Sequence, residues 1–273
     1  MKHSLLFLIL VGGLFFSCSN ENSSTNSQTI EKIISYIPQQ ANFQTKIISY
    51  YDTENRSTLD SVFDANNNFV RKRQYVYSSQ SRTTNTFDNL NVLTKIIIVE
   101  YDSTGRLTTV TSYDASGNIN FKYAYDYDDV NHTVTKNKVE GSTITPVFFF
   151  KVNSTGMIYY QQNILNNNSV TQLNYVGNKP ISMFFDNPIN LLNFNYYSIL
   201  KPMNLRISDV QKNNKVLDLG IEHMAFNADY YFSDYADSYF IQYTFDVNDY
   251  PLTAHELTPL TGSSMVEDFY YYN

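Results

Sequence analysis

Between residues 43 and 128 the chain alternates stretches rich in aromatic and β-branched residues with polar clusters that begin with aspartate. The segment 106–113 is typical of the apolar stretches. Its odd positions, from Leu107 to Tyr113, share one face of an extended strand, and its even positions, which include Val110 and Ser112, share the other. We expect the odd face to be partly apolar and the even face largely solvated. The pattern predicts β-strands of about eight residues separated by tight turns.

The turns repeat at a fixed spacing. An aromatic residue followed by aspartate recurs in steps of 12 or 24 residues, from Asp52 to Asp64 to Asp88 and from Asp102 to Asp114 to Asp126. Further pairs are Phe185-Asp186 and Phe245-Asp246. The aspartate can cap the turn that it opens, and the residue three positions later can adopt a positive φ, which suits Asn55, Asn67, Gly105 and Gly117. Strands joined by such short turns are antiparallel neighbours.

The predicted fold is therefore all-β: an antiparallel meander of short hairpin-linked strands that forms a large curved or rolled sheet. After about residue 140 the apolar runs become denser, as in 146–150, 181–185 and 189–194, which is typical of buried strands. We expect residues 30–273 to form a single β-meander domain. A division into two lobes near residue 140 is the alternative.

The N-terminus is typical of an export signal. Lys2 and His3 precede a run of apolar residues and glycines from Leu5 to Phe16, which is shorter than the roughly 20 residues of a membrane-spanning helix. Residues 1–17 are therefore predicted to be a signal peptide. Residues 18–29 contain no aliphatic or aromatic side chain after Cys18 and have the composition of a flexible polar tether.

The sequence around Cys18 resembles a bacterial lipobox, in which a small residue precedes a cysteine that becomes lipidated. The matching residues are Phe15-Phe16-Ser17-Cys18, although Phe16 is bulkier than the usual occupant. This resemblance implies lipidation of Cys18 and attachment to the outer membrane. In lipoproteins of the Bacteroidetes type, acidic residues after the cysteine direct export to the cell surface, and Glu21 is the only acid in this stretch. Both the periplasmic face and the cell surface therefore stay open.

A second resemblance rests on Tyr101-Asp102-x-x-Gly105-Arg106-Leu107 and Tyr113-Asp114-x-x-Gly117-Asn118. These units look like the YD repeat of Rhs-type proteins and of Bacteroidetes lipoproteins of unknown function. The resemblance is good over roughly residues 43 to 128. It implies a long antiparallel meander and no assigned activity, because the motif describes turn chemistry.

Composition excludes several classes of function. The 273 residues include 24 Tyr and 19 Phe but a single Cys, so no intrachain disulfide or cysteine-based zinc cluster can form. The formal net charge of −7 argues against a nucleic-acid partner, whose phosphates require clustered Lys and Arg. No phosphate-binding or dinucleotide-binding glycine motif is present, and no cofactor is expected.

Three groups of residues are candidates for sites. Asp126, Asp128 and Asp129 form the densest oxygen cluster and are a weak candidate for Ca²⁺, although a solvated hairpin turn is the favoured interpretation because the Gly and distal Glu of a calcium loop are missing. The aromatic run that contains Tyr230, Tyr231 and Tyr235 could stack on sugar rings, but aromatics in strands more often belong to the core. Ser61 and Ser103, each after an aspartate, resemble sites of O-glycosylation in exported Bacteroidetes proteins.

These observations predict a non-enzymatic, lipid-anchored envelope protein with a binding or structural role. Its expected partners are the membrane, through the lipid, and a glycan or another envelope protein. One alternative is a glycan-active enzyme on a β scaffold, since paired carboxylates can converge from neighbouring strands. The other is a carrier of an apolar ligand, with a concave face lined by Phe148 to Phe150 and by Phe184 and Phe185.

Overall fold

The computed structural model describes residues 29–39, 43–166, 168–176, 179–186, 189–196, 214, 217–218, 232–235, 239–248, 250–257 and 264–272. These residues form one 18-stranded antiparallel sheet. The strands are β1 (Ile30–Gln39), β2 (Phe43–Tyr51), β3 (Ser57–Phe63), β4 (Phe69–Tyr77), β5 (Ser81–Asp88), β6 (Leu93–Tyr101), β7 (Leu107–Asp114), β8 (Ile119–Asp128) and β9 (Thr133–Glu140). They continue with β10 (Thr143–Val152), β11 (Ile158–Asn163), β12 (Ser169–Val176), β13 (Lys179–Asp186), β14 (Ile189–Tyr196), β15 (Phe232–Tyr235), β16 (Tyr239–Phe245), β17 (Pro251–Leu257) and β18 (Ser264–Tyr272).

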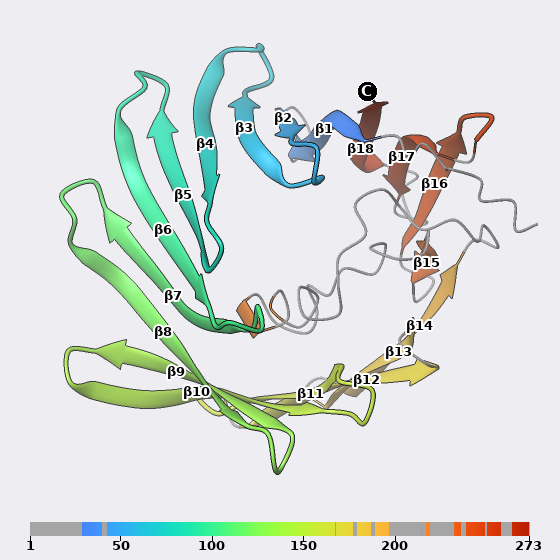
Figure 1. The fold of residues 1–273 in the computed structure, drawn as a ribbon. Helices are drawn as coiled ribbons and strands as arrows, with labels where there is room; N and C mark the ends of the chain where they lie inside the picture. Colours follow the sequence, from blue (N-terminus) through green and yellow to red (C-terminus); the bar gives the residue numbers. More distant parts are fainter. Residues whose placement is uncertain are drawn as a thin grey trace, which may run out of the picture.

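The sheet is rolled, and its strands follow one another in chain order around a ring (Figure 1). β1 pairs with β2 on one side and with β18 on the other, so the last strand lies beside the first. β9 and β10 form a hairpin with its turn at 140–143, so the ladder of paired strands is continuous from β9 to β10. The all-β antiparallel meander predicted from the turn spacing is confirmed.

The predicted turn residues have the predicted backbone conformation. Asn55 and Asn67 have φ values of 56° and 63°, and Gly105 and Gly117 have values of 84° and 86°. The turn predicted at Tyr125-Asp126 is wrong, because this pair lies inside β8. The turn begins two residues later, at Asp128. Because neighbouring strands are antiparallel, successive turns alternate between the two ends of the rolled sheet. The turns led by Asp52 and Asp102 share one end, here called the cleft end.

The predicted faces of β7 are wrong, and a β-bulge explains why. Tyr101 pairs with Leu107 and Glu100 pairs with Thr109, so the register shifts by one residue between these pairs. Beyond the bulge the even positions face the interior: Val110 is 3% exposed and Ser112 is fully buried. A one-residue shift moves every later side chain to the opposite face, which simple alternation from Leu107 cannot anticipate.

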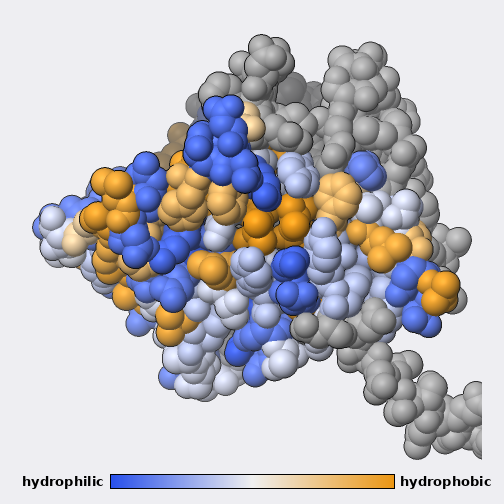
Figure 2. Space-filling view, turned by 90° about the horizontal axis from the view of Figure 1, so that it is seen from above, coloured by the Kyte–Doolittle hydropathy of each residue, from blue (hydrophilic) through white to orange (hydrophobic). Residues whose placement is uncertain are grey.

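The main hydrophobic core lines the inside of the roll from β6 to β13. Val99, Val110, Tyr125, Phe150 and Met183 represent five of these strands in the cluster. Leu217, which lies outside the strands, is 1% exposed and belongs to the same cluster, so its side chain packs against the inner face of these strands. On the outer surface seen from above, apolar residues occur in separate groups among polar ones (Figure 2).

A second, smaller cluster lies where the sheet meets itself. Ile30 and Ile33 on β1 pack with Ala254 on β17 and Tyr270 on β18. Removal of this apolar surface from water stabilises the pairing of the first and last strands.

The ammonium group of Lys136 is buried in the interior. The Lys136 ammonium lies 4.6 Å from the centroid of the Tyr123 ring and 5.6 Å from that of Tyr125, and it donates a 2.7 Å hydrogen bond to the backbone oxygen of Asp218. Burial lowers the pKa of Lys136, and the negative charge of Asp218 opposes this effect. The contact ties the segment that contains Leu217 and Asp218 to β9.

The backbone conformation at Gly117 gives a direct test of the turn chemistry. A Cβ added there would meet nothing within 4 Å, so Gly117→Ala should cost about 1–2 kcal/mol through the left-handed φ alone. Urea unfolding measures the loss. Ser116→Ala, in the same exposed turn, should change the free energy of unfolding by less than about 0.5 kcal/mol. Equal effects from the two substitutions would contradict the assignment.

Lys136 offers a test of the interior contact. Lys136→Ala should lower the free energy of unfolding by about 2 kcal/mol, because it removes the cation–π contacts and leaves the Asp218 oxygen without this donor. Lys138→Ala is the matched control on the same strand, since its side chain is 40% exposed and its ion pair with Glu140 lies at the surface. A loss at position 138 as large as that at 136 would show that the interior contact has no special role.

Candidate functional site

The candidate site is built on the turn led by Asp102. Its Oδ1 accepts hydrogen bonds from the backbone N–H groups of Thr104 and Arg106 at 2.8 and 2.9 Å, and the N–H of Gly105 donates to the Asp102 carbonyl. Hydrogen bonds from the Thr104 side chain and then from Arg106 hold the pKa of Asp102 well below its usual range, although burial opposes them. The carboxylate is therefore ionised whenever the turn is formed near neutral pH.

The Arg106 side chain is fixed from two directions. Its Nε donates to Asp102 Oδ2 at 2.8 Å, and its guanidinium lies 4.5 Å from the centroid of the Tyr127 ring. The Tyr127 hydroxyl donates to the Leu107 carbonyl at 2.9 Å, which holds the ring against the turn. With Nε bonded to Asp102 and the guanidinium stacked on the Tyr127 ring, Nη1 forms the outer edge of the group and can bond outside the turn.

The same arrangement occurs 50 residues earlier with one difference. Arg56 bonds to Asp52 and lies 4.7 Å from the Tyr77 ring, but its Nη1 contacts Glu54 of its own turn at 2.8 Å. In the Asp102 turn the equivalent position is Thr104, and the Nη1 of Arg106 bonds to Asp129 of a different hairpin. The ion pair of Arg106 therefore bridges two hairpins.

A cleft of about 230 Å³ lies at this end of the roll. Its floor is apolar and includes Val134, Ile158 and Leu217, which are 1–2% exposed. Asn214 lines it and supports the Asp102 turn from below, because its Oδ1 accepts from Leu107 N and its Nδ2 donates to Gly105 O, both at 2.8 Å. Apolar surface beneath a few oriented polar groups is the usual composition of a small-molecule site.

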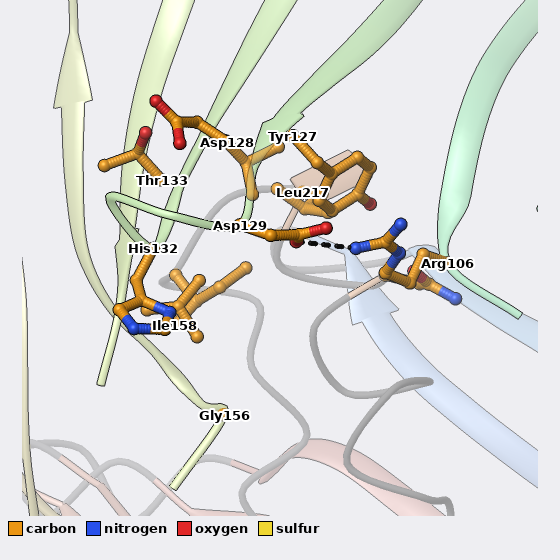
Figure 3. A pocket seen from close by; sticks show the side chains of 12 residues that line it. Arg106, Tyr127, Asp128, Asp129, His132, Thr133, Gly156, Ile158 and Leu217 are labelled. Atoms are coloured by element: carbon orange, nitrogen blue, oxygen red, sulfur yellow. Dashed lines mark hydrogen bonds and ion pairs between the residues drawn. The ribbon is translucent and has the colours of Figure 1, made fainter. Parts of the chain in front are cut away.

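Polar side chains surround the mouth of this cleft. Asp129 and Arg106 form a 2.8 Å ion pair at the mouth, with His132 and Ile158 to one side (Figure 3). The Asp129 side chain is 76% exposed. His132 is exposed, has a positive φ of 54° and accepts a backbone hydrogen bond from Val152, which joins two of the hairpins that form the cleft.

The calcium candidate is not assembled in this arrangement. Asp126 accepts a hydrogen bond from Asn137, Asp128 caps its own turn through Val130 and Asn131, and Asp129 pairs with Arg106. Asn131 holds the pKa of Asp128 below its usual range. Among the residues that the structure describes, no group of three His, Cys, Asp or Glu side chains is placed to hold a metal ion.

Of the other predicted site residues, only Ser103 lies in the turn that builds the candidate site. Ser103 is exposed in the Asp102 turn, whereas Ser61 lies half-buried on β3. Cys18, Tyr230 and Tyr231 lie outside the described residues, and Tyr235 is described only as part of the β15 backbone.

The three phenylalanines of β10 that were expected to line a concave face are divided between the two faces of this strand. Phe150 belongs to the core cluster that contains Leu217 and Phe148 packs against it, while Phe149 makes an edge contact with Tyr160. Phe185 also packs against this core. Within the described part of the chain, no helix is long and apolar enough to cross a membrane.

No protein-family model matches the sequence, and no curated protein matches it either. A porin-like protein from Bacteroides uniformis is similar over 89% of this chain and 98% of its own, with a TM-score of 0.45 and 12% identity. A porin-like protein from Bacteroides vulgatus is similar over 90% of this chain and 99% of its own, with a TM-score of 0.43 and 13% identity.

A third similar structure is TcdB2-TccC3 without its hypervariable C-terminal region. It is similar over 84% of this chain but 14% of its own length, with a TM-score of 0.33 and 11% identity. At these TM-scores and identities, none of the three similarities carries an argument about function.

The lowered pKa of Asp102 makes the turn sensitive to acid. Its folded-state pKa lies below the ordinary value of 3.8, so the stability supplied by its hydrogen bonds is present above pH 3.8 and is lost as the pH falls below it. Asp102→Asn keeps the Oδ1 acceptor but removes the charge. We expect the variant to be less stable than the parent at neutral pH and the difference to shrink towards about pH 2.

Urea unfolding at several pH values measures this convergence. Ser103→Ala, in the same turn, serves as the control and should follow the parent at every pH. Parallel curves for the parent chain and Asp102→Asn would show that the carboxylate charge adds nothing to the turn.

Proposed function

We propose that this chain is a non-enzymatic, lipid-anchored cell-envelope protein with a binding role, and that the cleft beside Arg106 is its binding site. The observation that carries the binding role is the combination of an apolar floor with a mouth of oriented polar groups. The lipid anchor rests on the resemblance of the Cys18 region to a lipobox and on the polar tether that follows. Attachment to the outer membrane is part of the same proposal.

The position of β1 adds to this proposal. The Ile30 N–H donates to Asn55 Oδ1 at 3.1 Å, so β1 begins at the cleft end of the roll. The tether of residues 18–29 spans at most about 40 Å when fully extended. An anchor at Cys18 would therefore keep the cleft end within this distance of the lipid surface. A partner that reaches the cleft would be a small molecule, or the end of a longer chain, present close to the membrane.

Mutation of the proposed lipidation site tests the anchor. Cys18→Ala should leave an uncleaved precursor, and the parent chain treated with globomycin should accumulate the same precursor. Metabolic labelling with a fatty acid and separation of membrane and soluble fractions measure both effects. Ser17→Ala should preserve processing, since a small residue still precedes the cysteine. Normal processing of Cys18→Ala and absence of label from the parent chain would refute the anchor.

A further inference from the structure

We propose that the cleft beside Arg106 binds a single neutral sugar ring, either free or at the end of a glycan chain. The inference rests on the proposed binding role and adds the chemical class of the ligand. It follows from three features of the site: the way in which the charges at the mouth are paired, the hydrogen-bonding geometry of those pairs, and the apolar floor.

The guanidinium at the mouth is already paired within the protein. Arg106 lies between Asp102 and Asp129, at 2.8 Å from each, and Asp128 accepts hydrogen bonds from its own turn. An anionic ligand would have to compete with Asp129 for the guanidinium. A cationic ligand would have to compete with Arg106 for the carboxylate. A neutral ligand needs neither exchange and leaves both ion pairs in place as a preformed donor and acceptor, although the exposed pair with Asp129 adds little to stability.

A hydroxyl group suits a paired guanidinium and carboxylate. It can accept a hydrogen bond from Arg106 and donate one to Asp129 at the same time, since it carries one donor and two acceptor positions. Hydrogen bonds to charged groups are about twice as strong as those between neutral groups. His132 and Thr133, which also line the cleft, add further polar partners along the mouth. A ligand with several hydroxyl groups can use these positions together.

The floor favours a ring with an apolar face. Val152 and part of the Tyr127 ring, which are half-buried, offer apolar surface inside the cleft, and the buried side chains of Val134, Ile158 and Leu217 lie beneath them. The C–H groups of a sugar ring can cover this surface while its hydroxyl groups stay at the mouth. The cleft of about 230 Å³ lies below the 300–1,000 Å³ range of drug-sized sites, which limits the occupant to about one ring.

The first copy of the arrangement supplies a control within the same chain. Arg56 also lies on a tyrosine ring and bonds to the aspartate that leads its turn, but Glu54 of the same turn occupies its outer edge. Substitution of Arg56 therefore disturbs an equivalent turn without altering the cleft. A change in binding seen for Arg106 and not for Arg56 reports on the cleft itself.

The experiment uses the purified full-length chain and a panel of methyl glycosides of neutral hexoses, with glucuronate and glucosamine as charged probes. Saturation-transfer NMR detects binding, and calorimetry measures affinity. We expect at least one neutral methyl glycoside to bind. Asp129→Asn and Arg106→Gln should each weaken that binding by about tenfold or more, while Arg56→Gln leaves it unchanged. Asp129 is exposed, so its substitution remains informative if Arg106→Gln fails to fold.

Three results would overturn the proposal: no transfer to any neutral glycoside, tighter binding of a charged probe than of every neutral one, or binding that survives Asp129→Asn. These outcomes are separate from those of the anchor experiment. If Cys18→Ala blocks processing but no neutral glycoside binds, the anchor stands and the ligand class is wrong. If a glycoside binds at the cleft but the chain is not lipidated, the site stands and the anchor is wrong.

Discussion

The hydrogen bonds from turn amides to the side chain of the leading aspartate set the geometry on which the sheet depends. In each turn led by Asp52, Asp64, Asp88, Asp102 or Asp114, Oδ1 accepts from the residues two and four positions later. The residue between them has a positive φ. This fixes where one strand ends and the next begins. Since a one-residue slip would exchange the faces of a strand, the turns also determine which side chains enter the core.

The residue four positions after the aspartate gives the two ends of the roll different properties. Asn68 and Asn118 close their turns with hydrogen bonds that their side-chain amides donate to Asp64 and Asp114. Arg56 and Arg106 close their turns at the cleft end with ion-paired hydrogen bonds to Asp52 and Asp102, and their guanidinium groups lie on tyrosine rings. The hydroxyls of these tyrosines bond to carbonyls of the neighbouring hairpin, as do those of Tyr175 and Tyr272 in later strands. Tyrosine is therefore used as a hydrogen-bonding group as well as apolar surface, which accounts for part of its abundance.

The sequence predicts what is local and misses what is distant. Asn55, Asn67, Gly105 and Gly117 could be placed because the chemistry of a turn lies within five residues. The faces of β7 were wrong because a bulge is decided by pairing with β6, and the pairing of β1 with β18 joins residues at opposite ends of the domain. The cleft was missed because Arg106, Asp129, Ile158 and Leu217 come from four separated segments. One signal was present: Thr104 stands where the earlier copy of the turn has Glu54.

That single difference explains how a structural repeat can acquire a site. When Glu54 pairs with Nη1 of Arg56, the carboxylate partners of that guanidinium both belong to its own turn. When the equivalent residue is Thr104, which bonds inward to Asp102, the guanidinium edge faces the neighbouring hairpin and meets Asp129 there. An exposed ion pair of this kind adds little to stability, so its loss would cost the fold little. Its groups are nevertheless held in place by the Asp102 turn and the Tyr127 ring. A site of this type needs no new scaffold, because the interactions that build the turn also orient the groups that a ligand would meet.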